Sequence, residues 1–191
     1  MAKLIFFAGS SRRESVNKKL AKQATEIAKG MGADITFIDL AHYDIPIYNG
    51  DYEDEHGLPE KALDLKLMFE EHDGFFICAP EYNSSITPLL KNTLDWISRP
   101  HREGEGTLTA IKGKVAGLAS ASPGGLGGMR GLVPLRMMLG NIGVTVTPTQ
   151  ACISGAYSAF DDNGKLKDED NEKMLKSTVE EFVKTSQKLR G

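Results

Sequence analysis

Short apolar runs alternate along the chain with longer segments in which apolar residues recur every three or four positions. The apolar runs cover residues 3–8, 35–40, 74–79, 114–120 and 144–147, the last of which resumes near residues 151–153. The segments with helical spacing cover residues 16–29, 58–71, 88–97, 129–139 and 170–189. Continuous short runs are typical of strands buried on both faces, and a period of about 3.6 is typical of amphipathic helices. The pattern therefore predicts strands and helices in alternation.

This alternation favours an α/β fold with a doubly wound parallel sheet and helices on both faces. Right-handed crossovers leave two common strand orders, and five strands favour the flavodoxin-like order 2-1-3-4-5. At 191 residues the chain is expected to form a single domain over residues 1–191. Residues 42–57 have no helical period and are predicted to form a long irregular loop.

Composition narrows the class of protein. A net charge of −3 gives no indication of a nucleic-acid partner, and no apolar stretch reaches the roughly 20 residues of a membrane helix. The apolar run at the N-terminus is too short for a signal peptide. The two cysteines, Cys78 and Cys152, lie in apolar contexts without the spacing of a metal site or a disulfide framework. We therefore expect a soluble cytoplasmic protein without membrane insertion.

The loop after the first predicted strand, residues 9–17, combines a glycine, three hydroxyls and two arginines, and it opens a helix. Helix-start amides, hydroxyls and guanidinium groups together suit a phosphate. The alternative is an ordinary turn in which Ser15 caps the helix. The spacings of a P-loop and of GxGxxG are absent, which disfavours nucleotide triphosphatases and the usual dinucleotide fold.

Two further loops follow the third and fourth predicted strands. Residues 80–85 combine a proline with Tyr82 and Asn83, which suits a flat ligand that forms hydrogen bonds. Residues 120–128 are rich in glycine and allow a close approach of the backbone, although a flexible turn is the alternative. In the order 2-1-3-4-5 these loops meet at one edge of the sheet. They predict a mononucleotide site that suits FMN better than ATP, because no carboxylate for Mg²⁺ lies beside the phosphate loop.

Three motifs also carry a family resemblance. The pattern GSxRxxSxN is matched at residues 9–17, PEYN at residues 80–83, and LKN..DW.SR at residues 90–99. A glycine-rich loop that ends before Arg130 follows in the same order. In these motifs the sequence resembles the NADPH-dependent FMN reductase family, flavodoxin-like flavoproteins that include quinone, azo-dye and chromate reductases.

The resemblance implies a set of cofactor-binding residues. It assigns the FMN phosphate to Ser10, Arg12, Ser15, Val16 and Asn17, and the flavin ring to Pro80, Glu81, Tyr82, Asn83, Ser120, Ala121, Ser122 and Gly124. It implies NADPH or NADH as co-substrate, a ping-pong reaction with a quinone or similar acceptor, and a homodimer or homotetramer. No catalytic acid–base pair and no metal site are expected, since the flavin carries the hydride chemistry.

Other assignments stay open. Arg99 or Arg130 could meet the phosphates of the nicotinamide nucleotide or be solvated charges. Trp96 could belong to an interface, with residues 42–57 and 89–97, or to the core. A flavodoxin-type electron carrier is the main alternative function, although such carriers tend to be strongly acidic. A phosphoacceptor domain would need acidic residues where this chain has Gly9 and Ser10.

Overall fold

The computed structural model describes residues 1–190 and contains a five-stranded sheet in the order β2-β1-β3-β4-β5. The strands are β1 (Lys3–Ala8), β2 (Asp34–Asp39), β3 (Gly74–Cys78), β4 (Val115–Ala121) and β5 (Thr145–Ile153). All four pairings are parallel. The predicted flavodoxin-like fold and strand order are confirmed.

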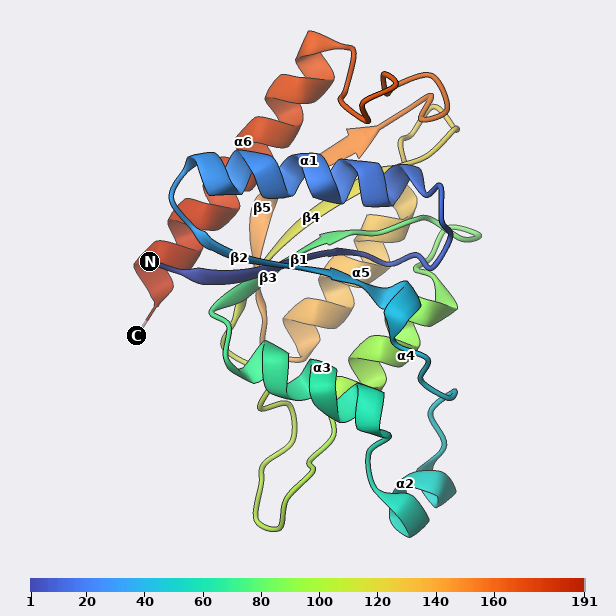
Figure 1. The fold of residues 1–191 in the computed structure, drawn as a ribbon, viewed down its shortest axis with the longest axis vertical. Coiled ribbons are helices and arrows are strands. Elements are labelled where there is room, and N and C mark those ends of the chain that lie inside the picture. The colour runs from blue at the N-terminus through green and yellow to red at the C-terminus, as the bar shows by residue number, and fades with distance from the viewer. Residues whose placement is uncertain (191) are drawn as a thin grey trace.

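Helices cover both faces of the sheet, α1 and α6 on one and α3, α4 and α5 on the other (Figure 1). Their bounds are α1 (Val16–Gly30), α2 (Gly50–His56), α3 (Glu60–Glu70), α4 (Pro88–Ile97), α5 (Met129–Asn141) and α6 (Glu169–Leu189). Arg190, the last described residue, donates a hydrogen bond to Met1 O near the start of β1 (Figure 1). Because all the strands are parallel, the loops that follow them lie at the opposite, carboxyl edge of the sheet.

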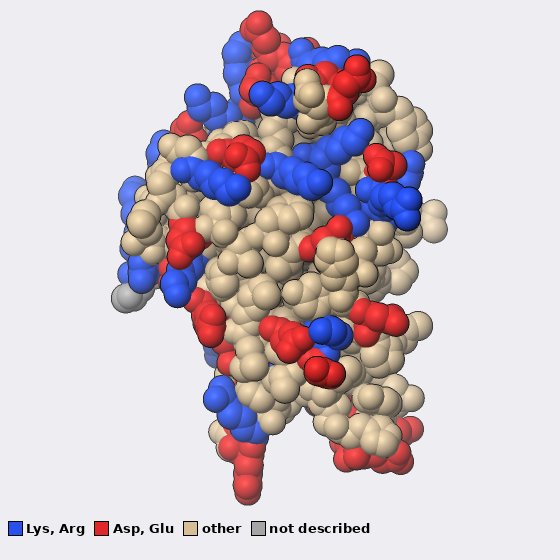
Figure 2. All heavy atoms as spheres, in the orientation of Figure 1, with Lys and Arg blue, Asp and Glu red and all other residues tan. Residues whose placement is uncertain are grey.

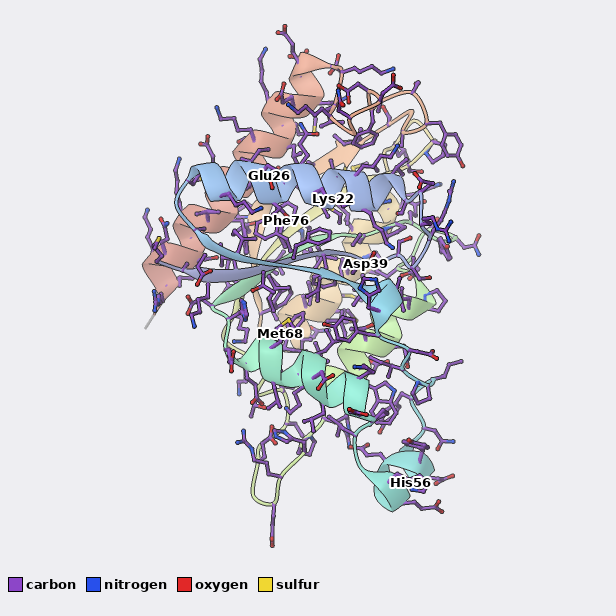
Figure 3. All side chains as sticks on the ribbon, viewed as in Figure 1. Lys22, Glu26, Asp39, His56, Met68 and Phe76 are labelled. Atoms are coloured by element: carbon purple, nitrogen blue, oxygen red, sulfur yellow. The ribbon has the colours of Figure 1, made fainter. Side chains whose placement is uncertain are left out.

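Strand β1 divides its side chains between two hydrophobic clusters. Phe6 faces α1 and α6 and stacks on Phe76 at 5.2 Å between ring centroids, whereas Phe7 faces α3 and meets Phe69 at 5.8 Å. Figure 3 shows Phe76 between the sheet and α1, and Met68 on the opposite side of the sheet. This burial of both faces explains the continuous apolar runs of the sequence.

The prediction of an irregular loop over residues 42–57 is wrong in part. A 3-10 helix covers Leu40–His42, and α2 follows. Asn49 caps α2 by accepting a hydrogen bond from Asp51 N at 2.9 Å, and acidic residues in the first turn favour a helix start. None of the residues of α2 is buried, so the sequence has no apolar period there to reveal a helix.

Helix α5 begins at Met129 and includes Pro134. The open assignment of Trp96 is decided by packing. Trp96 is fully buried, and its indole Nε1 donates to Pro46 O at 2.8 Å. The core role of Trp96 is therefore confirmed.

Lysines predominate among the charged residues of α1, whereas those of α2 are acidic. Figure 2 shows Lys and Arg side chains in a row over α1 and acidic side chains over α2. Among the described residues, none of the helices combines the length and the apolar character that crossing a membrane requires.

Candidate functional site

The loops after β1, β3, β4 and β5 converge on one cleft at the carboxyl edge of the sheet. The cleft is lined by Ser10, Arg12, Ser15, Val16, Asn17, Pro80, Glu81, Tyr82, Ala121, Ser122, Pro123 and Tyr157. Ten of these twelve residues are among the thirteen predicted from the sequence. Strands β1, β3 and β4 are neighbours in the sheet, which brings together loops that lie far apart in the sequence.

The start of α1 presents donors that are not used within the protein. Ser15 occupies the N-cap position, but its hydroxyl accepts no hydrogen bond from the helix. Within residues 1–190 the amides of Val16 and Asn17 have no acceptor, and the guanidinium of Arg12 has no ion-pair partner. The alternative of an ordinary turn capped by the Ser15 side chain is therefore not what the structure shows. Such donors at a helix start suit an anion.

Unlike the unused donors beside it, the side chain of Asn17 forms hydrogen bonds within the protein. Its Nδ2 donates to Ala121 O, and its Oδ1 accepts from Ala121 N, both at 2.9 Å. The side chain is buried and uses both polar ends on one backbone unit. Asn17 thereby ties the start of α1 to the end of β4 and fixes the width of the cleft.

The turn after β3 is a tight hairpin. Tyr82 and Ser85 exchange backbone hydrogen bonds of 2.9 and 3.0 Å, and Asn83 and Ser84 both have positive φ, 50° and 64°. Two successive positive φ values define a type I′ turn. The turn leaves Tyr82 58% exposed at the cleft, whereas Asn83 lies at the tip of the turn and does not line the cleft.

Residues of the glycine-rich loop either line a hollow at the site or hold neighbouring strands together. Ser120 is fully buried, and its Oγ donates to Ala79 O at 2.7 Å, so its hydroxyl holds β4 to β3. Gly124 lines a second hollow, which adjoins the cleft and shares Glu81 and Ser122 with it. Of the predicted residues, Asn83, Ser120 and Gly124 do not line the main cleft.

Two residues of the cleft were not among the named candidates: Pro123, which lies within the predicted loop at residues 120–128, and Tyr157, which sequence reasoning missed. Tyr157 follows β5, and its ring is 73% exposed. The signal was available, because the carboxyl end of every parallel strand reaches the same edge. The loop after β5 could have been included on that ground.

The remaining polar candidates are engaged within the protein. Arg99 Nε donates to both carboxylate oxygens of Glu53, at 2.8 and 2.9 Å. Arg130 pairs with Glu81, with Nη2 at 2.9 Å from Oε1. Burial raises the pKa of the Cys78 thiol, and burial with a smaller effect of Glu81 raises the pKa of the Cys152 thiol. Both cysteines are therefore neutral thiols near pH 7.

The residues of the cleft fit FMN as a group. Unused donors at the start of α1 and Arg12 suit the phosphate, and an exposed aromatic turn suits a flat ring. Gly127 and Gly128 adopt positive φ, and a Cβ at either would collide with Cys152 or Ser120, so these glycines let the loop pack closely on β4 and β5 beside the cleft.

Comparison with known proteins agrees with this geometry. The family model for NADPH-dependent FMN reductase matches residues 2–158. A quinone reductase of Pseudomonas putida is 33% identical over 92% of this chain and 89% of its own length. An NAD(P)H:quinone oxidoreductase of Solanum tuberosum is 31% identical over 99% of this chain and 95% of its own.

Among solved structures, the flavoenzyme FerB of Paracoccus denitrificans, an NAD(P)H:acceptor oxidoreductase, superposes with a TM-score of 0.83 at 31% identity, covering 98% of each chain. The fold, the cleft and the match over most of the chain lead to the same assignment. The chain belongs to the NADPH-dependent FMN reductase family and is an oxidoreductase that uses FMN and NAD(P)H.

Proposed function

We propose that this enzyme is an FMN-dependent NAD(P)H:quinone reductase. The observation that carries the proposal is the convergence, in one cleft, of unused anion donors at Arg12 and the start of α1 with the exposed Tyr82 turn. The similarity to quinone reductases over nearly the full chain supports quinones as the acceptor class. Azo dyes, chromate and free flavin are the other acceptors to be compared.

We propose the following cofactor-binding residues. The phosphate is held by Ser10, Arg12, Ser15, Val16 and Asn17, and the ring by Pro80, Glu81, Tyr82, Asn83, Ser120, Ala121, Ser122 and Gly124. Their roles differ in kind. The side chains of Arg12 and Ser15 have donors that are free to bind the cofactor. The side chains of Asn17, Glu81 and Ser120 instead form hydrogen bonds within the protein that fix the shape of the cleft.

FMN held in this cleft would supply the hydride chemistry, with the nicotinamide as donor and transfer of two electrons to the acceptor. The chain contributes binding, orientation and electrostatics. Arg12 and the amides of Val16 and Asn17 compensate the charge of the phosphate. Pro80 and the type I′ turn hold the Tyr82 ring at the mouth of the cleft. We expect both substrates to use this one cleft in turn, which gives ping-pong kinetics.

We further propose that residues 1–191 form one FMN-binding domain, that the protein is cytoplasmic, and that it is a homodimer or homotetramer. Support for the single domain comes from a sheet that spans the chain from β1 to β5. Sedimentation velocity of the purified protein measures the oligomeric state, and a monomer would contradict that part of the proposal.

The test of the proposal combines a spectrum and a rate. The protein as purified, or after reconstitution with FMN, should be yellow and should oxidise NADPH or NADH with benzoquinone as acceptor. An electron carrier would bind FMN but would be inactive without a separate reductase. A colourless protein that does not take up FMN would refute the proposal.

A further inference from the structure

The cleft and the hollow beside it are separated by residues that line both, and Glu81 is one of these residues. The hollow, of about 260 Å³, is lined by residues 124–128 and Arg130, together with Glu81 and Ser122. On the other side of Glu81 lies the main cleft with Tyr82. The side chain of Glu81 therefore lies between the turn after β3 and the glycine-rich loop after β4.

The carboxylate of Glu81 is fully engaged in hydrogen bonds. Its Oε2 accepts from Gly131 N at 3.2 Å, and its Oε1 accepts from Arg130 Nε at 3.1 Å and lies 2.9 Å from Arg130 Nη2. The side chain is 9% exposed. With both oxygens engaged by donors of α5, this carboxylate is directed toward the start of that helix.

Helix α5 has no side-chain cap from its own segment, and Gly131 N, which also donates to Gly128 O at 3.2 Å, gains a second and charged acceptor in Glu81. The N-cap residue of α5 is Gly128, which offers no side-chain acceptor, and the first turn of the helix contains no acidic residue. Glu81, 50 positions earlier in the chain, supplies both the acceptor and the negative charge that a helix start favours. The turn after β3 thus caps the helix that follows the glycine-rich loop.

Two glycines allow α5 to approach so closely. A Cβ at Gly131 would lie 3.0 Å from Ser85 O and 3.2 Å from Glu81 Cβ. A Cβ at Gly128 would lie 1.9 Å from Ser120 Oγ, the hydroxyl that donates to Ala79 O. The first turn of α5 is therefore packed directly on the segment that follows β3.

We propose that Glu81 is a positioning residue for the flavin. By capping α5 across the fold, its carboxylate holds residues 80–85 and 120–128 at a fixed separation, which is the width of the slot for the flavin ring. This inference rests on the proposed function, since it concerns the proposed FMN site. It assigns the carboxylate of Glu81 a role through α5 and Arg130, in addition to the place of residue 81 in the lining of the cleft.

Two variants test the inference, with FMN affinity measured by fluorescence quenching on the apoprotein. Glu81→Ala removes the cap and the ion pair, and we expect the dissociation constant for FMN to rise about tenfold. Glu81→Gln keeps an acceptor for Gly131 N but loses the charge opposite Arg130, and we expect an intermediate rise. The visible absorption band of bound FMN should lose resolution in both variants, because a wider slot admits water to the ring.

The matched control is Asp168→Ala. Asp168 caps α6 by accepting from Asn171 N at 2.8 Å, far in the chain from the cleft segments. It should lower the melting temperature of the apoprotein as Glu81→Ala does, yet leave FMN affinity and spectrum unchanged. The stabilisation that FMN adds should therefore shrink in the Glu81 variants alone.

The outcomes separate this inference from the proposed function. A wild-type protein that binds no FMN would refute the proposed function and the inference with it. A wild-type protein that binds FMN, beside Glu81 variants that bind it with equal affinity and an identical spectrum, would refute the inference alone. If the alanine variant does not fold, the comparison of Glu81→Gln with wild type decides.

Discussion

The cleft and the polar cluster around Lys66 both bring charged groups together, but they use them in opposite ways. Lys66 is fully buried on α3, and its Nζ lies 2.7 Å from Glu105 Oε1, 3.2 Å from Glu70 Oε1 and 2.8 Å from Thr109 Oγ1. At the cleft, Arg12 and the start of α1 have no such partners within the part of the chain that the structure describes. A network closed on itself serves the fold, whereas donors left open serve a ligand.

The cluster around Lys66 resembles a metal site, but a lysine of the chain supplies its positive charge. Ligand atoms of Glu70, His101 and Glu105 lie within 4.8 Å of one another. The ammonium of Lys66 already contacts two of these carboxylates. The positive charge that the acidic groups need is therefore part of the chain, and the cluster fastens the segment around Glu105 to α3.

The largest effect should come from Lys66→Ala. It leaves the nearly buried Glu105 without its main partner, and we expect the free energy of unfolding to fall by about 3–5 kcal/mol. Urea denaturation of the apoprotein measures the loss, and FMN affinity should not change. The control is Lys91→Ala, which removes an exposed pair with Asp95 and should cost below about 0.5 kcal/mol. Equal losses in the two variants would show that the Lys66 network does not stabilise the fold.

Arg12→Ala should have the next largest effect, and on binding instead of stability. Loss of a charge-assisted bond to the phosphate should raise the dissociation constant for FMN about 10- to 100-fold. The apoprotein should melt at the wild-type temperature, because Arg12 has no ion pair to lose within residues 1–190. The neighbouring Arg13, which is exposed and does not line the cleft, provides the control. If Arg13→Ala weakens FMN binding as much as Arg12→Ala does, Arg12 has no specific role in binding the phosphate.

Two hydroxyls at helix starts sharpen the comparison further. Thr87 Oγ1 accepts from Leu90 N at 3.1 Å and donates to Gly9 O at 2.7 Å, whereas the Ser15 hydroxyl caps nothing in α1. Thr87→Val should therefore cost the apoprotein about 1–2 kcal/mol, and Ser15→Ala below about 0.5 kcal/mol. Only the serine variant should weaken FMN binding without destabilising the apoprotein. A large loss of apoprotein stability in Ser15→Ala would mean that its hydroxyl serves the fold.

The smallest effect should come from lowering the pH from 5 to 4. Burial acts to raise the pKa of Glu105, but hydrogen bonds from Lys66, Thr109 and the His101 amide outweigh it and hold that pKa well below its usual value of 4.5. A carboxyl group with a lowered pKa stabilises the fold above its unfolded value, and the stabilisation is lost as the pH falls. Between pH 5 and pH 4 this group should contribute a loss of roughly 0.5 kcal/mol, measured by urea denaturation. The slope with pH should be shallower in Glu105→Gln, and an unchanged slope would assign the acid sensitivity to other carboxylates.

Much of this could be predicted from sequence because it depends on local pattern and on topology. Alternation of Phe6 and Phe7 between two cores follows from a strand buried on both faces, and the meeting of the loops follows from parallel order. Helix α2 could not be predicted, since it buries no residue. The bonding of Glu81 to Gly131 and of Asn17 to Ala121 could not be predicted either, because each pair depends on the final packing of distant segments.

The bridge between Asn17 and Ala121 also sets an order of events during synthesis. The two residues are 104 positions apart, so the phosphate end of the cleft has only one of its sides until β4 has been made and has joined the sheet. A nascent chain released before that point contains the whole phosphate-binding motif of residues 9–17 and still lacks the completed cleft. Uptake of the cofactor is therefore expected late, after most of the polypeptide has left the ribosome.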